Sequence, residues 1–193
     1  QLGTVCAYPK FTPVPFDERT LWDGYPEETN APYGLAKRNS LVQLQAARQE
    51  FGFNGIYLLP TNLYGPGDHF EPDRSHVIPA LIKKFVEAVE TGQEIVEIWG
   101  SGDASRDFLY IEDAVDGIIK ATEEWDSPEP VNLGSGQEIR IGVLVEIIKN
   151  LCDYKNKVVY NVSKPDGQPR RCLRTWTAKN FGWSAQVELK EGL

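Results

Sequence analysis

The sequence contains no methionine, only three cysteines and no excess of positive charge. The cysteines, at positions 6, 152 and 172, lie far apart, so the chain has no disulfide framework and is typical of a reducing compartment. The net charge of -8 argues against a general binder of nucleic acid or of anionic membranes. No membrane-spanning run, targeting signal or lipidation motif is present. We therefore expect a cytoplasmic protein with no metal, nucleic-acid or membrane partner.

A G-x-G-x-x-G turn, the usual phosphate-binding loop of a dinucleotide-binding fold, is also missing. The turn at residues 134–136 is not this motif, because it lacks the third glycine and leads into Ile139 rather than into a helix start. The chain begins at Gln1 within what reads as a strand, and stops at Leu193 as a helical pattern begins. We expect a fragment of a longer polypeptide, with a complete small protein as the alternative.

What is present is ordinary for a globular domain with a sizeable core: 193 residues, 41% hydrophobic and 25% charged. Periodicity predicts strands at 1–8, 54–59, 95–99, 108–110, 131–133 and 157–160, and helices at 33–50, 77–89, 112–122, 141–151 and 175–183. Loops are expected at 9–31, 61–75 and 163–171. Alternating strands and helices favour an α/β class with parallel strands.

One pair of residues predicts chemistry. Tyr33 and Lys37 lie four residues apart at the start of the expected helix, with Asn30 as a cap and Pro32 in the first turn. Residues at this spacing share a helix face, and an ammonium beside a phenol stabilises the phenolate, which favours proton transfer. The alternative is a half-buried tyrosine beside a solvated lysine.

Several motifs resemble, in order, those of the extended short-chain dehydrogenases/reductases, which are NAD(P)-dependent epimerases, dehydratases and reductases of nucleotide sugars. They are Leu-Gly-Thr-Val-Cys-x-Tyr-Pro, Asn-x-Pro-Tyr-x-x-x-Lys and Pro-Thr-Asn-Leu-Tyr-Gly-Pro. Ser-His-Val-Ile-Pro-Ala-Leu-Ile, Trp-Gly-Ser-Gly, Arg-Asp-Phe-Leu and Lys-Pro-Asp-Gly-x-Pro-Arg are similar to those of members that convert GDP-4-keto-6-deoxymannose to GDP-L-fucose. The resemblance implies epimerisation at C3 and C5 and then reduction at C4 with NADPH, NAD being the alternative cofactor.

The resemblance also implies a Rossmann-like fold that lacks the N-terminal part of its parallel sheet. Residues 1–62 would be the C-terminal part of the Rossmann domain. Residues 63–193 would mostly form a small substrate-binding lobe, with one or more segments returning to the sheet. Without the glycine-rich loop we expect the chain to be inactive alone. The implied partners are a GDP-sugar, a second copy of this chain in a homodimer, and a separate chain that supplies the N-terminal half.

Five residues receive catalytic roles from this resemblance. Tyr33 would protonate the oxygen at C4, and Lys37 would support it and bind the nicotinamide ribose. Thr4 would donate a hydrogen bond to the substrate carbonyl. Cys6 and His76 would exchange protons on opposite faces of the sugar, because a thiol and an imidazole both do so near neutral pH. The alternatives are an ordinary strand threonine, a buried strand cysteine and a helix-start histidine.

Five further residues, and three of the catalytic ones, receive binding roles. Asn62 would contact substrate and cofactor, and His76 would join Tyr33, Lys37 and Asn62 at the cofactor. Lys84, Trp99, Arg106 and Arg171 would hold the diphosphate and the base or ribose, since arginine suits bidentate phosphate contacts. For Asn62 and Trp99 the alternatives are a turn former and a core residue.

Two local differences affect the functional prediction. Residues 4–6 read Thr-Val-Cys where the family's 4,6-dehydratases have Thr-Asp-Glu, which argues against a dehydratase. Arg174 stands where the resembled members carry an acid, and this difference would alter the contacts to guanine or ribose. The remaining alternatives are another NDP-sugar epimerase/reductase of the same family and a non-catalytic, truncated nucleotide-sugar-binding domain.

Overall fold

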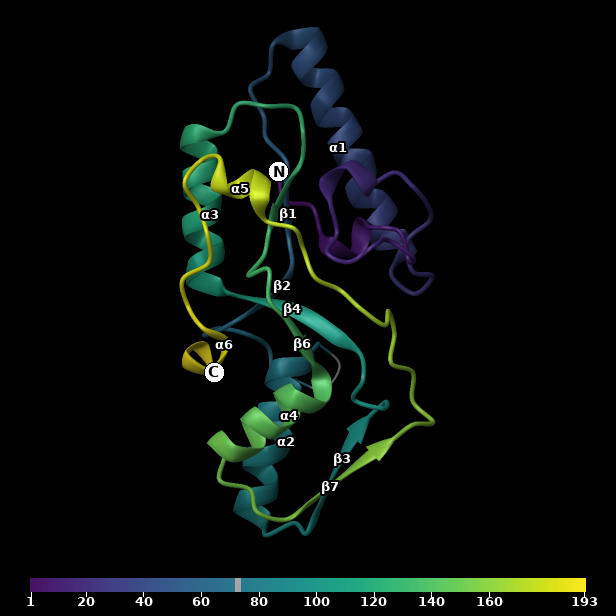
Figure 1. Ribbon diagram of the computed structural model, residues 1–193, viewed down its shortest axis with the longest axis vertical. Helices are drawn as coiled ribbons and strands as arrows, with labels where there is room; N and C mark the ends of the chain where they lie inside the picture. The colour runs from purple at the N-terminus through teal and green to yellow at the C-terminus, as the bar shows by residue number, and fades with distance from the viewer. Residues whose placement is uncertain (72–73) are drawn as a thin grey trace.

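The computed structural model describes residues 1–71 and 74–193, in which strands and helices alternate (Figure 1). The helices are α1 (Ala31–Phe51), α2 (Val77–Thr91), α3 (Ile111–Glu124), α4 (Ile141–Leu151), α5 (Trp176–Lys179) and α6 (Leu189–Gly192), and the 3-10 turns are η1 (Val5–Ala7) and η2 (Glu18–Thr20). The strands are β1 (Leu58–Pro60), β2 (Asn62–Tyr64), β3 (Ile95–Trp99), β4 (Ser105–Tyr110), β5 (Val131–Leu133), β6 (Glu138–Arg140) and β7 (Lys157–Asn161). The predicted α/β class is confirmed.

The strands form small sheets in which parallel pairing dominates. β1 pairs in parallel with β5, β2 with β4 and β3 with β7, whereas β6 is antiparallel to β4. Leu2 adds a parallel bridge to Leu58, with Gly3 N–H donating to the Leu58 carbonyl at 2.7 Å. Since β5 bonds to the neighbouring residues of β1, the N-terminal residues and β5 lie on opposite edges of β1.

The sheet around β1 is covered on both faces, by α1 on one side and α3 on the other (Figure 1). Leu59 belongs to the core cluster that contains Leu41 of α1, and its neighbour Leu58 belongs to the cluster that contains Ala114 of α3. Successive side chains of a strand point to opposite faces of the sheet. Leu58 and Leu59 therefore each need an apolar side chain, because both faces are covered by a helix.

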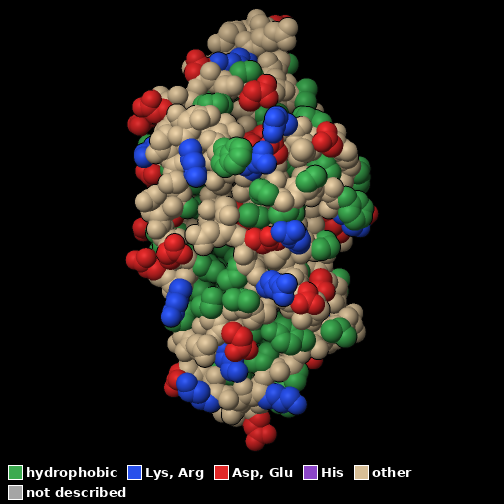
Figure 2. Space-filling model, in the orientation of Figure 1, with side chains coloured by type: hydrophobic (Ala, Val, Ile, Leu, Met, Phe, Trp, Pro, Cys, Tyr) green, Lys and Arg blue, Asp and Glu red, His purple; other side chains and the backbone are tan. Residues whose placement is uncertain are grey.

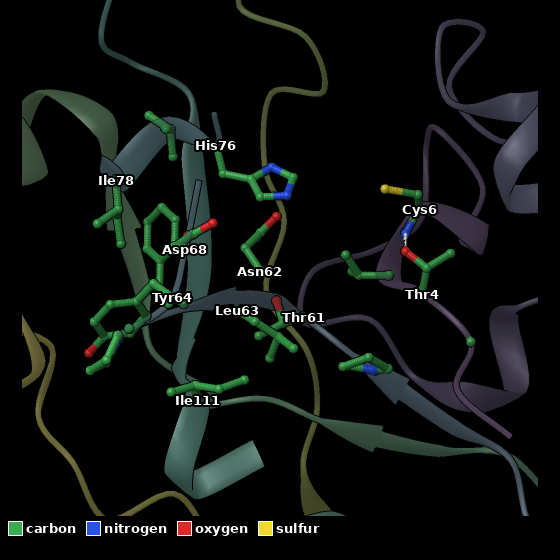
Figure 3. A pocket seen from close by; sticks show the side chains of 18 of the residues that line it. Thr4, Cys6, Thr61, Asn62, Leu63, Tyr64, Asp68, His76, Ile78 and Ile111 are labelled. Atoms are coloured by element: carbon green, nitrogen blue, oxygen red, sulfur yellow. Dashed lines mark hydrogen bonds between the residues drawn. The ribbon is translucent and has the colours of Figure 1, made fainter. Parts of the chain in front are cut away.

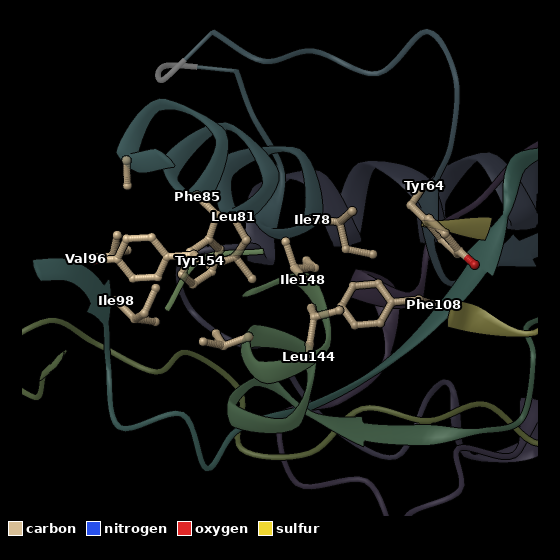
Figure 4. Close-up of a cluster of buried hydrophobic side chains, with 12 residues drawn as sticks. Tyr64, Ile78, Leu81, Phe85, Val96, Ile98, Phe108, Leu144, Ile148 and Tyr154 are labelled. Atoms are coloured by element: carbon tan, nitrogen blue, oxygen red, sulfur yellow. The ribbon is translucent and has the colours of Figure 1, made fainter. Parts of the chain in front are cut away.

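A second core lies at the other end of the molecule, between α2, α4 and strands β3 and β7 (Figure 4). Ile78, Leu81 and Phe85 recur at helical spacing along α2, and Leu144 and Ile148 do so along α4. All five are buried, which explains why these helices were predictable from periodicity. The packing of α2 fixes its first turn, directly after His76.

The predicted strand at 1–8 is wrong beyond Leu2. Residues 5–7 form the 3-10 turn η1, capped by Thr4, whose Oγ1 accepts a hydrogen bond from Cys6 N–H at 3.2 Å. The Ala7 N–H donates to the Thr4 carbonyl at 3.1 Å. These local bonds replace the ladder that a longer strand would need, as threonine side chains often do.

Other differences concern short elements. The expected loop 61–75 contains β2, and its residues 72 and 73 lie outside the described residues. Strand β6 was not predicted, and the expected helix 175–183 is only α5. By contrast, β3, β5 and α4 have the predicted bounds. Gly52 and Gly92 end α1 and α2 with φ of 65° and 68°, a left-handed conformation that glycine adopts without strain.

Acidic and basic side chains are interspersed over the face shown in Figure 2. Among the described residues, no helix is long and apolar enough to cross a membrane. In the same residues, no group of three His, Cys, Asp or Glu side chains is placed to hold a metal ion.

Candidate active site

Five of the predicted site residues line one cavity of about 610 Å³. They are Tyr33, together with Thr4, Cys6, Asn62 and His76, which are labelled in Figure 3. They come from four segments: the capped turn η1, the first turn of α1, strand β2 and the residue before α2. The fold therefore assembles a site from residues that the sequence places up to 72 positions apart (Thr4 to His76).

Cys6 and His76 face each other across this cavity (Figure 3). The Cys6 side chain projects from η1, and the imidazole projects from the extended residue that precedes α2. Asn62 lies beside His76, with its side-chain oxygen directed toward the imidazole (Figure 3). A flat ring in this space would present one face to the thiol and the other to the imidazole.

Tyr33 and Lys37 share one face of α1, as their spacing predicts. The Lys37 Nζ lies 5.6 Å from the centre of the Tyr33 ring and donates a hydrogen bond to the Leu2 carbonyl at 2.9 Å. The Tyr33 side chain is exposed at the cavity wall, with a relative exposure of 52%. The ammonium is thus held beside the phenol by the backbone of the N-terminal residues.

Asn62 is oriented by β4. Its Nδ2 donates to the Asp107 carbonyl at 2.8 Å, and the Thr61 Oγ1 donates to the same oxygen at 3.0 Å. The amide nitrogen is therefore engaged away from the cavity, and the side-chain oxygen of Asn62 faces it as an acceptor.

Asp107 is a supporting residue that sequence reasoning missed. Its side chain is fully buried and accepts from the N–H and Oγ of Ser135, and from the N–H groups of Gly136 and Leu173. Burial raises the pKa of Asp107 to about 6, although these hydrogen bonds oppose the shift. The available signal was an acid directly before the expected apolar strand at 108–110. Asp107 joins β4 to the turn after β5 and, through its carbonyl, to Asn62.

The two predicted arginines lie close to Cys6. Arg171 is buried, its Nη1 donates to the Cys6 Sγ at 3.6 Å, and its Nε and Nη2 donate to the Gln168 Oε1 at 3.2 and 3.1 Å. Arg106 Nη1 donates to the Gln168 carbonyl at 2.6 Å. Burial, and next the positive charge of Arg171, lower the pKa of Arg106 to about 10.

Lys84 and Trp99 do not line the cavity. They form a separate group on α2 and at the end of β3, where the Nζ atoms of Lys84 and Lys164 lie 5.4 and 5.2 Å from the centre of a Trp99 ring. Trp99 is 64% exposed, so the alternative that it is a core residue is wrong. Arg174 is likewise outside the cavity: its Nη1 donates to the Asp17 carboxylate at 2.6 Å.

A sequence model of the NAD dependent epimerase/dehydratase family matches residues 1–134. The chain belongs to this family. Its α/β fold, its parallel strand pairs and its Tyr-x-x-x-Lys helix are those of an extended short-chain dehydrogenase/reductase, as its motifs predicted.

The chain is similar along its whole length to proteins named GDP-L-fucose synthase. It is 43% identical over 192 residues to "Probable GDP-L-fucose synthase 1" of Oryza sativa subsp. japonica, and 40% identical over 192 residues to "GDP-L-fucose synthase 1" of Arabidopsis thaliana. It covers 58% and 59% of these proteins, so it spans less than two thirds of the curated relatives it matches.

The fold of this chain is also similar to that of a solved structure. The crystal structure of a GDP-L-fucose synthetase from Naegleria fowleri bound to NADP superposes with a TM-score of 0.90 at 27% identity. The superposition covers 99% of this chain and 62% of that one.

Proposed function

We propose that this site belongs to an enzyme that converts GDP-4-keto-6-deoxymannose to GDP-L-fucose by epimerisation at C3 and C5 and reduction at C4. The observation that carries the proposal is the placement of Cys6 and His76 across one cavity, with Tyr33 on its wall. The similarity to proteins named GDP-L-fucose synthase supports the same substrate. A 4-epimerase alone would have no use for the cysteine and the histidine.

The epimerisation needs one base and one acid on opposite faces of the ring. One of the pair Cys6 and His76 takes the proton from C3 or C5, and the C–H electron pair moves toward the C4 oxygen as an enolate. The other returns a proton from the opposite face, which inverts the carbon. Thr4 Oγ1 accepts from Cys6 N–H, so its own proton is available for the C4 oxygen.

The reduction uses Tyr33 and Lys37. The Lys37 ammonium lies beside the Tyr33 ring, and the exposed Tyr33 side chain lines the cavity, an arrangement that suits the nicotinamide ribose. The sequence holds no glycine-rich phosphate loop, so the residues present fit this end of NADP(H) only. A bound NADPH would supply the hydride to C4. Tyr33 then protonates the C4 oxygen, and Asn62 and His76 complete the wall.

Three further proposals concern the surroundings of the chain. We place it in the cytoplasm, in keeping with its three free cysteines. We propose a homodimer, and a further segment or separate chain that supplies the N-terminal half of the family's cofactor site. We also propose that residues 1–62 are the C-terminal part of a Rossmann domain. Residues 63–193 would mostly form the substrate-binding lobe, with one or more segments returning to the Rossmann sheet.

Deuterium exchange tests the proposal without NADPH. The chain is incubated with GDP-4-keto-6-deoxymannose in D₂O, and deuterium at C3 and C5 is measured by NMR. We expect incorporation at both carbons, and its loss in Cys6→Ser and His76→Asn. Cys152→Ser, which lies outside the cavity, is the matched control and should exchange like the parent chain.

The two alternatives predict different results. Faster exchange with a UDP- or dTDP-linked 4-keto sugar would favour another NDP-sugar epimerase/reductase. Calorimetric binding of the GDP-sugar with no exchange would show a non-catalytic binding domain, and would overturn the proposal.

A further inference from the structure

Gln168 is buried where the loop 163–171 meets the segment that follows η1. We propose that Gln168 is a positioning residue, which fixes the Arg171 guanidinium and leaves its positive charge free for the diphosphate of a GDP-sugar. The orientation of Arg171 in the free chain needs no ligand. The diphosphate half of the inference rests on the proposed function.

The side-chain amide of Gln168 bridges two distant parts of the chain. Its Oε1 accepts hydrogen bonds from the Nε and Nη2 of Arg171, at 3.2 and 3.1 Å. Its Nε2 donates to the Lys10 carbonyl at 3.2 Å. Because both ends of the amide are engaged, its orientation is fixed, and the plane of the guanidinium is fixed with it. The remaining nitrogen of Arg171, Nη1, lies 3.6 Å from the sulfur of Cys6, a residue of the cavity wall.

The charge of Arg171 has no carboxylate to neutralise it. Neither Arg171 nor Arg106 forms an ion pair with any residue that the structure describes. Arg106 Nη1 donates to the Gln168 carbonyl at 2.6 Å, so one residue holds both guanidinium groups. The Asp166 carboxylate is engaged elsewhere, because it accepts from the N–H and the Oγ of Ser101, both at 2.8 Å. Two neighbouring buried cations are costly unless an anion completes the site.

A neutral partner explains how the site keeps this charge. Glutamine accepts the donors of a guanidinium as a carboxylate would, but it adds no negative charge that would cancel the charge of Arg171. Burial, and next the charge of Arg171, lower the pKa of Arg106, so this charge acts on its surroundings undiminished. A diphosphate beside the sugar ring would supply the missing anion, and arginine suits its bidentate contacts.

The affinities for GDP and for guanosine, which lacks the phosphates, test the inference on the chain as it is. Both are titrated by NMR, and the ratio of the two dissociation constants measures the preference for GDP. Gln168→Leu removes the acceptor, and Gln168→Glu cancels the charge. We expect each to lower the preference by about tenfold, with guanosine binding unchanged. Gln43→Leu, at an exposed position of α1, is the matched control and should leave the preference unchanged.

A double variant tests whether Gln168 acts through Arg171. Arg171→Gln by itself should lower the preference for GDP, and adding Gln168→Leu should lower it no further. The NMR signal of the Arg171 Nε–H group in the free chain reports the orientation directly. We expect this proton to exchange slowly with water in the parent chain and faster in Gln168→Leu, because the hydrogen bond to Oε1 is lost.

Several results would overturn the inference. An unchanged preference in Gln168→Leu, an equal loss of GDP and guanosine binding, or an additional loss in the double variant would each show that Gln168 does not act by positioning Arg171. A fast-exchanging Arg171 Nε–H in the parent chain, or a parent chain without preference for GDP, would also contradict it. Deuterium exchange at C3 and C5 measures proton transfer and this assay measures diphosphate binding, so the failure of one is distinguishable from the failure of the other.

Discussion

At the scale of the residue, Asp107 shows how one buried side chain can hold a site that it does not touch. Its carboxylate collects donors from Ser135, Gly136 and Leu173, and its carbonyl orients Asn62. Burial raises its pKa from 3.8 to about 6 in the folded chain. The folded state therefore binds this proton more tightly than the unfolded state, and Asp107 contributes most to stability below about pH 4.

That shift has a measurable consequence. As the pH rises from about 4 to above 6, the free energy of unfolding should lose a contribution of about 3 kcal/mol, since one pKa unit corresponds to about 1.4 kcal/mol. Asp107→Asn should lack this loss, because an amide does not titrate. The free energy of unfolding of the parent chain should therefore fall relative to that of the variant between pH 5 and pH 8. Urea unfolding at several pH values measures it. Asp103→Asn, at an exposed position, is the control, and a difference that grows with pH would contradict the assignment.

At the scale of the element, α1 carries two adjacent pairs of residues with different tasks. Tyr33 lines the cavity with Lys37 beside it, whereas Gly34 and Arg38, one position further on, face η1. Arg38 is buried, and its Nε donates to the Ala7 carbonyl at 2.7 Å. The helix thus fixes its proton-transfer pair and the turn that carries Cys6 in one unit.

Removing Arg38 tests this docking. Arg38→Ala leaves the carbonyls of Ala7 and Gly24 without their donors, and should lower the free energy of unfolding by about 2–4 kcal/mol. Arg19→Ala is the comparison, because Arg19 has an 82% exposed side chain and forms only a surface ion pair, whose loss should change the free energy of unfolding little. Urea unfolding compares the two variants. Equal losses would show that Arg38 does not hold η1.

At the scale of the whole molecule, one side of the sheet is left open. Residues 1–3 pair with Leu58 on one edge, and no further strand follows them among the described residues. On α1, Leu35, Val42 and Phe51 are exposed. An open strand edge and exposed apolar side chains each favour association, which is the physical reason for the proposed homodimer.

Sedimentation velocity tests the homodimer. The expected species is a dimer with twice the 21.7 kDa mass of one chain. The double variant Leu35→Glu, Val42→Glu should shift the equilibrium toward the single chain, because the added charges repel each other across the interface. Glutamates at two exposed positions of α3, Val115 and Ile119, form the matched control. A parent chain that sediments as a single 21.7 kDa species at all concentrations would contradict the dimer.

The sequence by itself determined the elements whose signals are local. Apolar residues at helical spacing and glycine caps predicted α2 and α4, apolar runs predicted β3 and β5, and the four-residue spacing predicted that Tyr33 and Lys37 share a face. The motifs also indicated the family and five residues that line one cavity.

The tertiary structure alone decided what depends on distant partners. Strands β2 and β6 exist because β4 pairs with both, and the first residues turn into η1 because Thr4 caps that turn and α1 packs on it. Asp107 became a supporting residue through Leu173, 66 positions away, and Arg171 reached Cys6 across 165 positions. No local pattern encodes such contacts, because burial and charge proximity are properties of the folded chain.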